Sequence, residues 1–304
     1  WIGTTVGLFR YDPVGDAFHH VPLDLPELRN AEILGMGADP NGALWMGGGV
    51  LGLRWFDPET GDLEWYRHAE DDPATLSSDD VYRVLVDREG VLWATTYDRG
   101  INRLERGSTT FQRYQADAVG LASNTVTCAF QGSAGTLWFC TANGVTVMDP
   151  ARKPFVTMRS VPSSASSLGA EAVYALFEDD SGDLWVGTWG GGLDRIDART
   201  QSIRRYRYDS RDEGTLGADI VRSITQDNDG TLWVATYGGG LSRMEEGSSR
   251  FTRYKNAPSD VASLSENFTT VVFVDRSDVL WVGTNSGGLN RYSPETGSFE
   301  AHRP

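Results

Sequence analysis

The chain has 304 residues, among them 10 tryptophans and 35 glycines, and its formal net charge is −15 at pH 7. A chain of this length can bury a sizeable core. Nucleic acids and anionic membrane surfaces attract positive charge, so this acidic balance predicts binding to neither. No apolar run of about 18 residues occurs, so we expect no membrane contact by these residues.

A tryptophan motif recurs along the whole chain. Its fullest copies read DLWVGTWGGGLDRID, TLWVATYGGGLSRME and VLWVGTNSGGLNRYS. The seven motif tryptophans are Trp1, Trp45, Trp93, Trp138, Trp185, Trp233 and Trp281. Their successive spacings of 44, 48, 45, 47, 48 and 48 residues indicate repeated structural units.

Each repeat predicts four short strands, bounded by glycine, aspartate and proline. In chain order these are an apolar run, the tryptophan strand, a strand of the GLDRID type and a strand of the IRRYRY type. Apolar first strands are expected at 172–179, 219–227 and 269–275, whereas the repeat of Trp1 shows no such run. Such repeats predict an all-β fold, a seven-bladed β-propeller of four-stranded antiparallel blades. We expect one propeller domain over 1–304, with the blade of Trp1 lacking its innermost strand.

A tight turn is predicted between the first two strands of each blade. Aspartate at its first position and glycine at its fourth are typical of a type I turn. The first position holds Asp39, Asp87, Gly132, Asp179, Asp227 and Asp275. The fourth position holds Gly42, Gly90, Gly135, Gly182, Gly230 and Asp278.

The repeated glycines and tryptophans are interpreted as architecture. Glycines that cradle phosphate open a helix, but the clusters at 190–192, 238–240 and 287–288 lie between strands. We expect them to form turns that need positive φ or close backbone approach. The recurring tryptophans are expected to fill the space between adjacent sheets.

The fourth residue after each tryptophan varies from blade to blade and is the first candidate site. Trp189 and Tyr237 occupy it in successive blades, beside Asn285, and could stack against a sugar ring. Tyr97, Asp98 and Arg99 would supply polar groups nearby. The alternative is that Trp189 and Tyr237 only cover their own glycine turns.

A second candidate set lies two residues before each first strand and would ring the mouth of the central channel. It consists of Asp79, Asn124, Glu171, Asp219 and Asn267. These side chains either cap the linker turn or recognise sugar hydroxyls, and the two roles are compatible.

No catalytic constellation emerges from the residues. The four histidines are His19, His20, His68 and His302, and no serine or cysteine lies in a nucleophile elbow. No ligand spacing suggests a metal, and no cofactor is expected. A carboxylate pair stays possible among 42 acidic residues.

Two cysteines, Cys128 and Cys140, fall opposite one another on the first two strands of one blade. A cross-strand disulfide is possible, but its geometry is demanding. We expect two buried thiols instead.

The segments 167–197 and 214–244 closely resemble the two-component regulator propeller repeat. The linkers at 71–85 and 256–272 share that repeat's Ser-Leu-Ser-x-Asn lead-in, whereas Gly132, Cys140 and Thr95 depart from the pattern. The resemblance implies a periplasmic sensor region of a bacterial receptor, followed in a longer protein by a β-sandwich, a membrane helix and a histidine kinase or diguanylate cyclase. It also implies a homodimer in the full-length receptor and, for several members, oligosaccharide sensing.

We therefore expect a sensor or ligand-binding propeller, part of a longer signalling protein, that responds to an oligosaccharide or another small polar ligand. A propeller glycoside hydrolase or lyase is the alternative from the enzyme class. A protein-interaction scaffold without a small ligand is the third hypothesis.

Overall fold

The structure is a computed structural model that describes residues 1–23, 31–116, 120–149, 156–161, 164 and 167–303. The chain divides into two compact units. The first contains Trp1–Ala142 and Thr146–Thr157, and the second contains Asn143–Val145 and Met158–Pro304. None of the described residues forms a helix that is both long and apolar enough to cross a membrane.

Four sheets, numbered here as blades 1 to 4 in chain order, begin in the first unit. Blade 1 has three strands, Ile2–Thr4 (β1), Gly7–Asp12 (β2) and Ala17–Val21 (β3). Blade 2 consists of Gly35–Ala38 (β4), Leu44–Gly47 (β5), Leu53–Phe56 (β6) and Leu63–Tyr66 (β7), with a short 3-10 helix at Gly49–Leu51 (η1). Blade 3 consists of Val81–Val86 (β8), Leu92–Thr96 (β9), Ile101–Leu104 (β10) and Phe111–Tyr114 (β11). Blade 4 consists of Val126–Gln131 (β12), Leu137–Thr141 (β13), Gly144–Met148 (β14) and Val156–Met158 (β15).

Three further sheets, blades 5 to 7, form the second unit. Blade 5 consists of Val173–Glu178 (β16), Leu184–Thr188 (β17), Leu193–Ile196 (β18) and Ile203–Tyr206 (β19). Blade 6 consists of Val221–Gln226 (β20), Leu232–Thr236 (β21), Gly240–Met244 (β22) and Thr252–Tyr254 (β23). Blade 7 consists of Thr269–Val274 (β24), Leu280–Thr284 (β25), Leu289–Ser293 (β26) and Ser298–His302 (β27).

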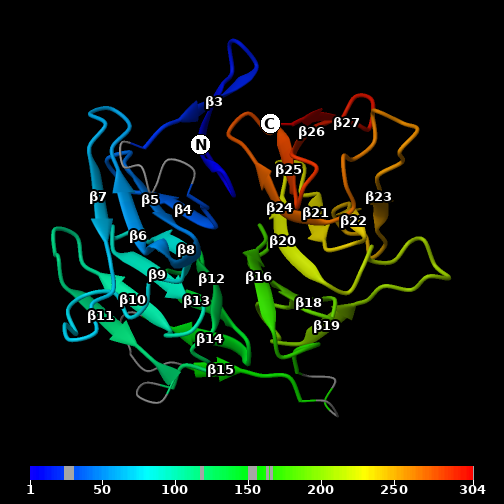
Figure 1. Ribbon diagram of the computed structural model, residues 1–304. Coiled ribbons are helices and arrows are strands. Elements are labelled where there is room, and N and C mark those ends of the chain that lie inside the picture. The colour runs from blue at the N-terminus through cyan, green and yellow to red at the C-terminus, as the bar shows by residue number, and fades with distance from the viewer. Residues whose placement is uncertain (24–30, 117–119, 150–155, 162–163, 165–166, 304) are drawn as a thin grey trace. The chain divides into compact units, whose positions relative to one another are not determined.

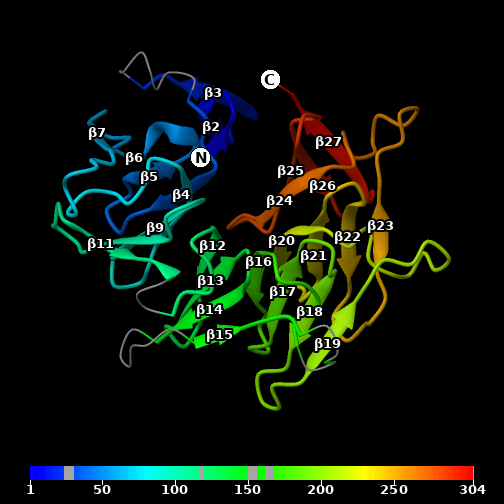
Figure 2. The same cartoon turned by 60° about the horizontal axis from the view of Figure 1, so that its bottom comes forward.

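The fold is the predicted seven-bladed β-propeller. Strand order within every sheet follows the chain, and the described pairings are antiparallel. In blade 1 the first strand, β1, directly follows Trp1, so this sheet lacks the strand that precedes the tryptophan in every other blade, as predicted. Figures 1 and 2 show the blades of each unit following one another, with β16, β20 and β24 adjacent in the second unit.

The recurring tryptophans pack between neighbouring sheets. Trp185 shares a core cluster with Val221 and Leu232 of blade 6, and Trp93 shares one with Val126 and Leu137 of blade 4. Burying a large apolar side chain stabilises a fold by about 1.5–3 kcal/mol. The prediction is confirmed for Trp93, Trp185, Trp233 and Trp281, which are buried, whereas Trp45 and Trp138 are half-buried and Trp1 is exposed.

The first-to-second strand turns have the predicted chemistry. Gly182 N donates to Asp179 O at 2.8 Å, which closes a four-residue turn. Blade 7 makes the same turn without glycine, because Asp278 adopts a φ of 64° and donates to Asp275 O. Asparagine and aspartate tolerate this left-handed conformation better than other non-glycine residues.

Each complete blade from 3 to 7 has a register shift near the start of its first strand. The pairing skips one residue, as in a β-bulge, which often re-aims a side chain next to a functional site. The skipped residues are Tyr82, Thr127, Tyr174, Arg222 and Thr270.

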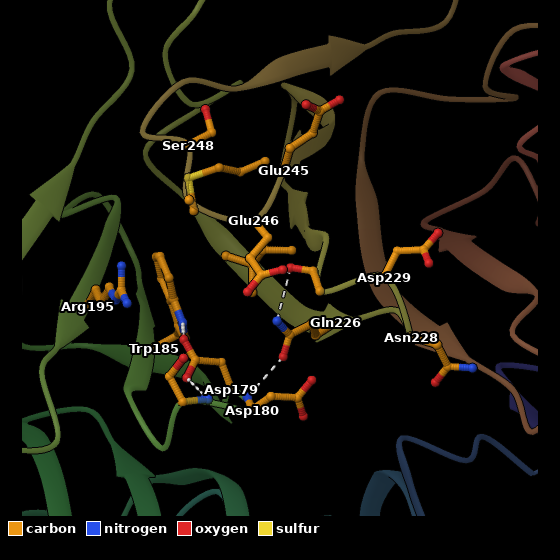
Figure 3. Close-up of a pocket in the computed structure, with 15 residues that line it drawn as sticks. Asp179, Asp180, Trp185, Arg195, Gln226, Asn228, Asp229, Glu245, Glu246 and Ser248 are labelled. Atoms are coloured by element: carbon orange, nitrogen blue, oxygen red, sulfur yellow. Dashed lines mark hydrogen bonds between the residues drawn. The ribbon is translucent and has the colours of Figure 1, made fainter.

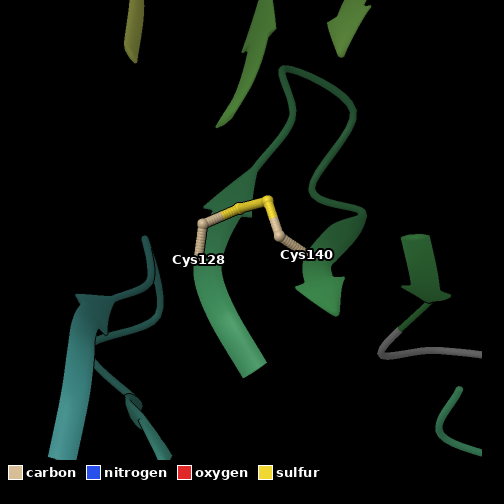
Figure 4. Close-up of a disulfide and its surroundings, with 2 residues drawn as sticks. All are labelled: Cys128 and Cys140. Atoms are coloured by element: carbon tan, nitrogen blue, oxygen red, sulfur yellow. A yellow bond between two sulfur atoms is a disulfide. The ribbon is translucent and has the colours of Figure 1, made fainter. Parts of the chain in front are cut away.

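The prediction of two buried thiols is wrong, because Cys128 and Cys140 form a disulfide (Figure 4). The two residues lie directly opposite each other on β12 and β13, with their Cα atoms 4.8 Å apart. That separation is within the usual range for a disulfide. The register shift between Val126 and Cys128 sets this alignment, and the strand pattern alone did not specify it.

Candidate functional site

The glycine cluster of blade 5, residues 190–192, forms a tight turn between β17 and β18. Gly192 adopts a φ of 76° and donates its N–H to Asp219 O at 2.9 Å. A Cβ at Gly192 would lie 2.3 Å from Tyr206 O, so no other residue fits without displacement. The interpretation of these glycines as structural is confirmed.

Trp189 directly follows β17, and its backbone pairs with residues of two linkers. Its N–H donates to Ala172 O at 2.8 Å, and it forms an isolated antiparallel bridge with Ile220. Its side chain nevertheless stays 44% exposed. The backbone is therefore fixed while the indole is presented to solvent.

Tyr237 occupies the same position in blade 6 and is half-buried. Its N–H donates to Ile220 O at 2.9 Å, and its ring centroid lies 6.1 Å from that of Trp189. The structure therefore brings together the two aromatic residues that the sequence singled out.

Two aromatic rings that sequence reasoning missed extend this pair. Tyr174, the skipped residue of β16, lies 5.2 Å from Trp189, and Phe268, just before β24, lies 4.7 Å from Tyr237, both measured between ring centroids. We call Tyr174, Trp189, Tyr237 and Phe268 the aromatic ladder. Phe268 is 42% exposed, so both Trp189 and Phe268 present apolar surface to solvent.

Asn285 occupies the same position in blade 7. Its backbone N–H donates to Phe268 O at 2.9 Å, and its side chain is exposed. The Phe268 ring lies next to the Tyr237 ring. The sequence signal that could have pointed to Phe268 is the variation, from blade to blade, of the residue just before each first strand. This residue is Asp80, Thr125, Ala172, Ile220 and Phe268 in turn.

The second candidate set caps the linkers. Asp219 Oδ1 accepts the N–H of Tyr208 and Asn267 Oδ1 accepts that of Asn256, both at 2.8 Å. Asn124 and Asp79 make the same bond to Ala116 and His68. Capping, the simpler of the two hypotheses, is thus confirmed for four of the five positions.

Glu171 is the exception in that set. Its backbone carbonyl accepts the N–H of Gly144 at 2.7 Å, whereas its side chain is exposed. Glu171 immediately precedes Ala172, the acceptor of the Trp189 N–H, and therefore lies beside the ladder in the chain.

The remaining candidates lie in the first unit. Tyr97, Asp98 and Arg99 are exposed, and Tyr97 packs 5.9 Å from Tyr82, the skipped residue of β8. Asp98 lies 3.9 Å from Arg99. Burial and the charge of Asp98 raise the pKa of the nearby Asp80. These residues and Asp80 form a smaller group with one aromatic pair, whereas the Asp79 side chain pairs with Arg67 at 2.7 Å.

A separate acidic hollow of about 380 Å³ lies at the other end of β17 (Figure 3). Its carboxylates are Asp179, Asp180, Asp229, Glu245 and Glu246. Asp179 accepts the indole N–H of Trp185 at 2.8 Å, and Gln226 links two turns by accepting Asp180 N and donating to Gly230 O. Among the described residues, no group of three or more histidine, cysteine or acidic side chains is placed to hold a metal ion.

Three segments of the chain match the family described as two component regulator propeller, namely residues 120–143, 167–190 and 215–238. The second segment runs through β16 and β17 to Trp189, and the third runs to Tyr237 and its glycine turn. A search of curated protein sequences finds no match.

Several solved structures share the fold. One is described as the extracellular domain of a hybrid two component system, BT3049, from B. thetaiotaomicron, with a TM-score of 0.78, 24% identity and coverage of 96% of this chain. Another, the extracellular domain of BT4673 from the same organism, has a TM-score of 0.56, 19% identity and coverage of 100% of this chain. A virginiamycin B lyase from Staphylococcus aureus has a TM-score of 0.66 and 15% identity, and the match covers 89% of this chain and 84% of the lyase.

All three identities are below 25%, so these likenesses establish a shared fold. This chain spans 38% of the BT3049 structure and 47% of the BT4673 structure. The chain is a seven-bladed β-propeller, and three of its segments match the two component regulator propeller family.

Proposed function

We propose that this chain is the extracytoplasmic sensor propeller of a bacterial two-component-type receptor, and that it binds an oligosaccharide or another small polar ligand at the aromatic ladder. The observation that carries the proposal is the contact between Trp189 and Tyr237, two side chains from the variable slot of successive blades. Their backbones are fixed by hydrogen bonds, so little ordering would oppose binding.

The exposure of the ladder supports a binding role. Its rings lie on the second unit in a continuous series with centroid separations of 5.2, 6.1 and 4.7 Å. Exposed apolar patches of this kind mark interaction sites more often than isolated surface residues do. Flat aromatic faces suit the C–H face of a sugar ring, while neighbouring backbone and amide groups suit its hydroxyls.

Two observations support an extracytoplasmic location. The Cys128–Cys140 disulfide favours an oxidising compartment, because such bonds are rare where thiols are kept reduced. The chain is also similar to structures described as extracellular domains of signalling systems. A homodimer whose association changes on ligand binding would transmit the signal.

Thermal-shift screening against an oligosaccharide panel tests the proposal. A ligand of the native state raises the melting temperature in proportion to its occupancy. We expect Trp189→Ala and Tyr237→Ala each to reduce the shift strongly. Tyr208→Ala is the matched control, because Tyr208 is a 41% exposed aromatic side chain outside the ladder.

If no member of the panel raises the melting temperature of the wild type or of either ladder variant, the scaffold hypothesis is favoured.

The acidic hollow of Figure 3 favours an enzyme as a second candidate, since it gathers five carboxylates. Turnover of a glycan that is lost in both Asp180→Asn and Glu246→Gln, but kept in Trp189→Ala, would support that candidate instead.

A further inference from the structure

Arg222 lies beside the aromatic ladder in an unusual position. It is the residue that the β20 pairing skips, and its guanidinium carbon lies 4.9 Å from the centre of the Tyr174 ring. Tyr174 in turn contacts Trp189. The bulges of two successive blades thus place a cation next to the ladder, on a half-buried side chain.

The other arginines near this end of blade 5 have partners. Arg205 pairs with the buried Asp194 at 3.0 Å. Arg207 donates to Gly190 O at 3.3 Å and lies 4.0 Å from Asp219. By contrast, the Arg222 side chain forms no hydrogen bond with the described residues, and none of their carboxylates lies within 4.0 Å of its guanidinium.

Acidic side chains in the linkers before β20 and β24 are engaged elsewhere, whereas Glu171, in the linker before β16, has an exposed side chain. Asp219 accepts the N–H of Tyr208 at 2.8 Å. Glu266 accepts Ser286 N at 2.7 Å and Gly287 N at 3.1 Å. These carboxylates hold loop backbones and leave the charge of Arg222 uncompensated by an ion pair.

We infer that the ligand of the aromatic ladder is an acidic oligosaccharide, whose carboxylate or sulfate group pairs with Arg222 while its rings stack on Trp189 and Tyr237. This inference rests on the proposed function. The guanidinium fork can pair with two oxygens of a carboxylate or a sulfate, and its stacking on Tyr174 fixes its plane. Because the protein as a whole is strongly negative, a local cation favours the binding of an anionic ligand at this place.

Calorimetric titration of the propeller with two probe pairs tests the inference. The first pair is a galacturonate trimer and its carboxyl-reduced, neutral counterpart. The second pair is a chondroitin sulfate disaccharide and its desulfated form, which separates sulfate from carboxylate recognition. Each probe is titrated into wild type, Arg222→Gln, Trp189→Ala and the control Arg204→Gln.

Arg204 is a matched control because it also stacks on a tyrosine, 5.1 Å over Tyr206, but on the outer strand β19. We expect Arg222→Gln to weaken binding of the galacturonate trimer by about tenfold and binding of its carboxyl-reduced, neutral counterpart by less than about twofold. Arg204→Gln should match the wild type. Added salt should weaken the acidic probe in the wild type more than in Arg222→Gln.

Equal affinity for acidic and neutral probes, with no effect of Arg222→Gln, overturns the inference. If Trp189→Ala still weakens both probes in that case, the proposed function stands without it. If none of the four probes binds, the inference is overturned, and the oligosaccharide panel then decides the proposed function separately.

Discussion

Trp185 donates its indole N–H to Asp179 Oδ2 at 2.8 Å, and the other carboxylate oxygen of Asp179 accepts the N–H groups of Ser181 and Asp183. One aspartate therefore closes the turn and satisfies the polar atom of the tryptophan that fills the space between two sheets. The same bond joins Trp93 to Asp87, Trp233 to Asp227 and Trp281 to Asp275 at 2.7–2.9 Å. In blade 2, Asp39 Oδ2 accepts the indole N–H of Trp55 at 3.3 Å, in place of that of the motif residue Trp45.

Replacing this aspartate should destabilise the propeller. We expect Asp227→Ala to lower the free energy of unfolding by about 2 kcal/mol, because a partly buried indole N–H and two turn N–H groups lose a charged acceptor. Urea unfolding followed by tryptophan fluorescence measures the change. Asp229→Ala, in the same turn, serves as the control and should change stability by less than about 0.5 kcal/mol. Equal effects of the two variants would contradict the role assigned to Asp227.

Reduction of the Cys128–Cys140 disulfide should also lower stability. The bond links residues 12 apart in sequence, and loops of this size gain about 3 kcal/mol or less from a crosslink. We expect a reducing agent to lower the melting temperature of the wild type and to leave a Cys128→Ala/Cys140→Ala double variant unchanged. Two titratable thiols in the native protein, made under oxidising conditions, would contradict the disulfide.

Asp194 should make stability depend on pH. Burial raises the pKa of Asp194, although the N–H of Gly169 and the guanidinium of Arg205 oppose the rise. The folded state therefore binds a proton more readily than the unfolded state, and this contribution to stability falls as the pH rises from about 4 through the raised pKa.

Asp194→Asn should remove that pH dependence. Asn102 and Asn290 occupy the equivalent position in blades 3 and 7 and accept the linker N–H of Ser77 and Ser265, so asparagine suits the site. The stability of the variant relative to the wild type should increase with pH across that window, as measured by urea unfolding at several pH values. A difference that does not vary with pH would count against the raised pKa.

Arg54 occupies the same position in blade 2 and is fully buried. Its Nη2 donates to Glu32 O at 3.0 Å, while Nε and Nη1 have no hydrogen-bond partner in the described chain, and burial lowers the pKa of Arg54 to about 10. Replacing a buried charge by an apolar side chain of similar volume is often neutral or stabilising.

We therefore expect Arg54→Met to keep or raise the free energy of unfolding, and Arg54→Ala to lower it by about 3 kcal/mol because it leaves a cavity. Urea unfolding of the two variants compares these effects. If Arg54→Met is as destabilising as Arg54→Ala, the guanidinium contributes more than packing.

The architecture could be predicted from the sequence because its signals are local and repeated. The spacing of the tryptophans, the Asp and Gly positions of the turns and the absence of a first strand before Trp1 all reappear in the structure. The bond between Asp179 and Trp185 was missed, although the constant separation of six residues between aspartate and tryptophan in five blades was a visible signal.

The site was predicted in part. Trp189 and Tyr237 share a variable slot, so their contact follows from the repeat once neighbouring blades are adjacent. Tyr174 and Arg222 join them through β-bulges, which depend on how two strands pair and leave no mark in the alternation of a single strand.

By itself, the sequence determined the number of blades, the strand order within each blade and the turns, because strand period and turn chemistry act over a few residues. Tertiary structure alone decided that Phe268 lies next to Tyr237, that Cys128 faces Cys140, and that Arg222 stacks on Tyr174. Each of these depends on the register between strands or the packing of separate blades, where a shift of one residue turns a side chain to the opposite face.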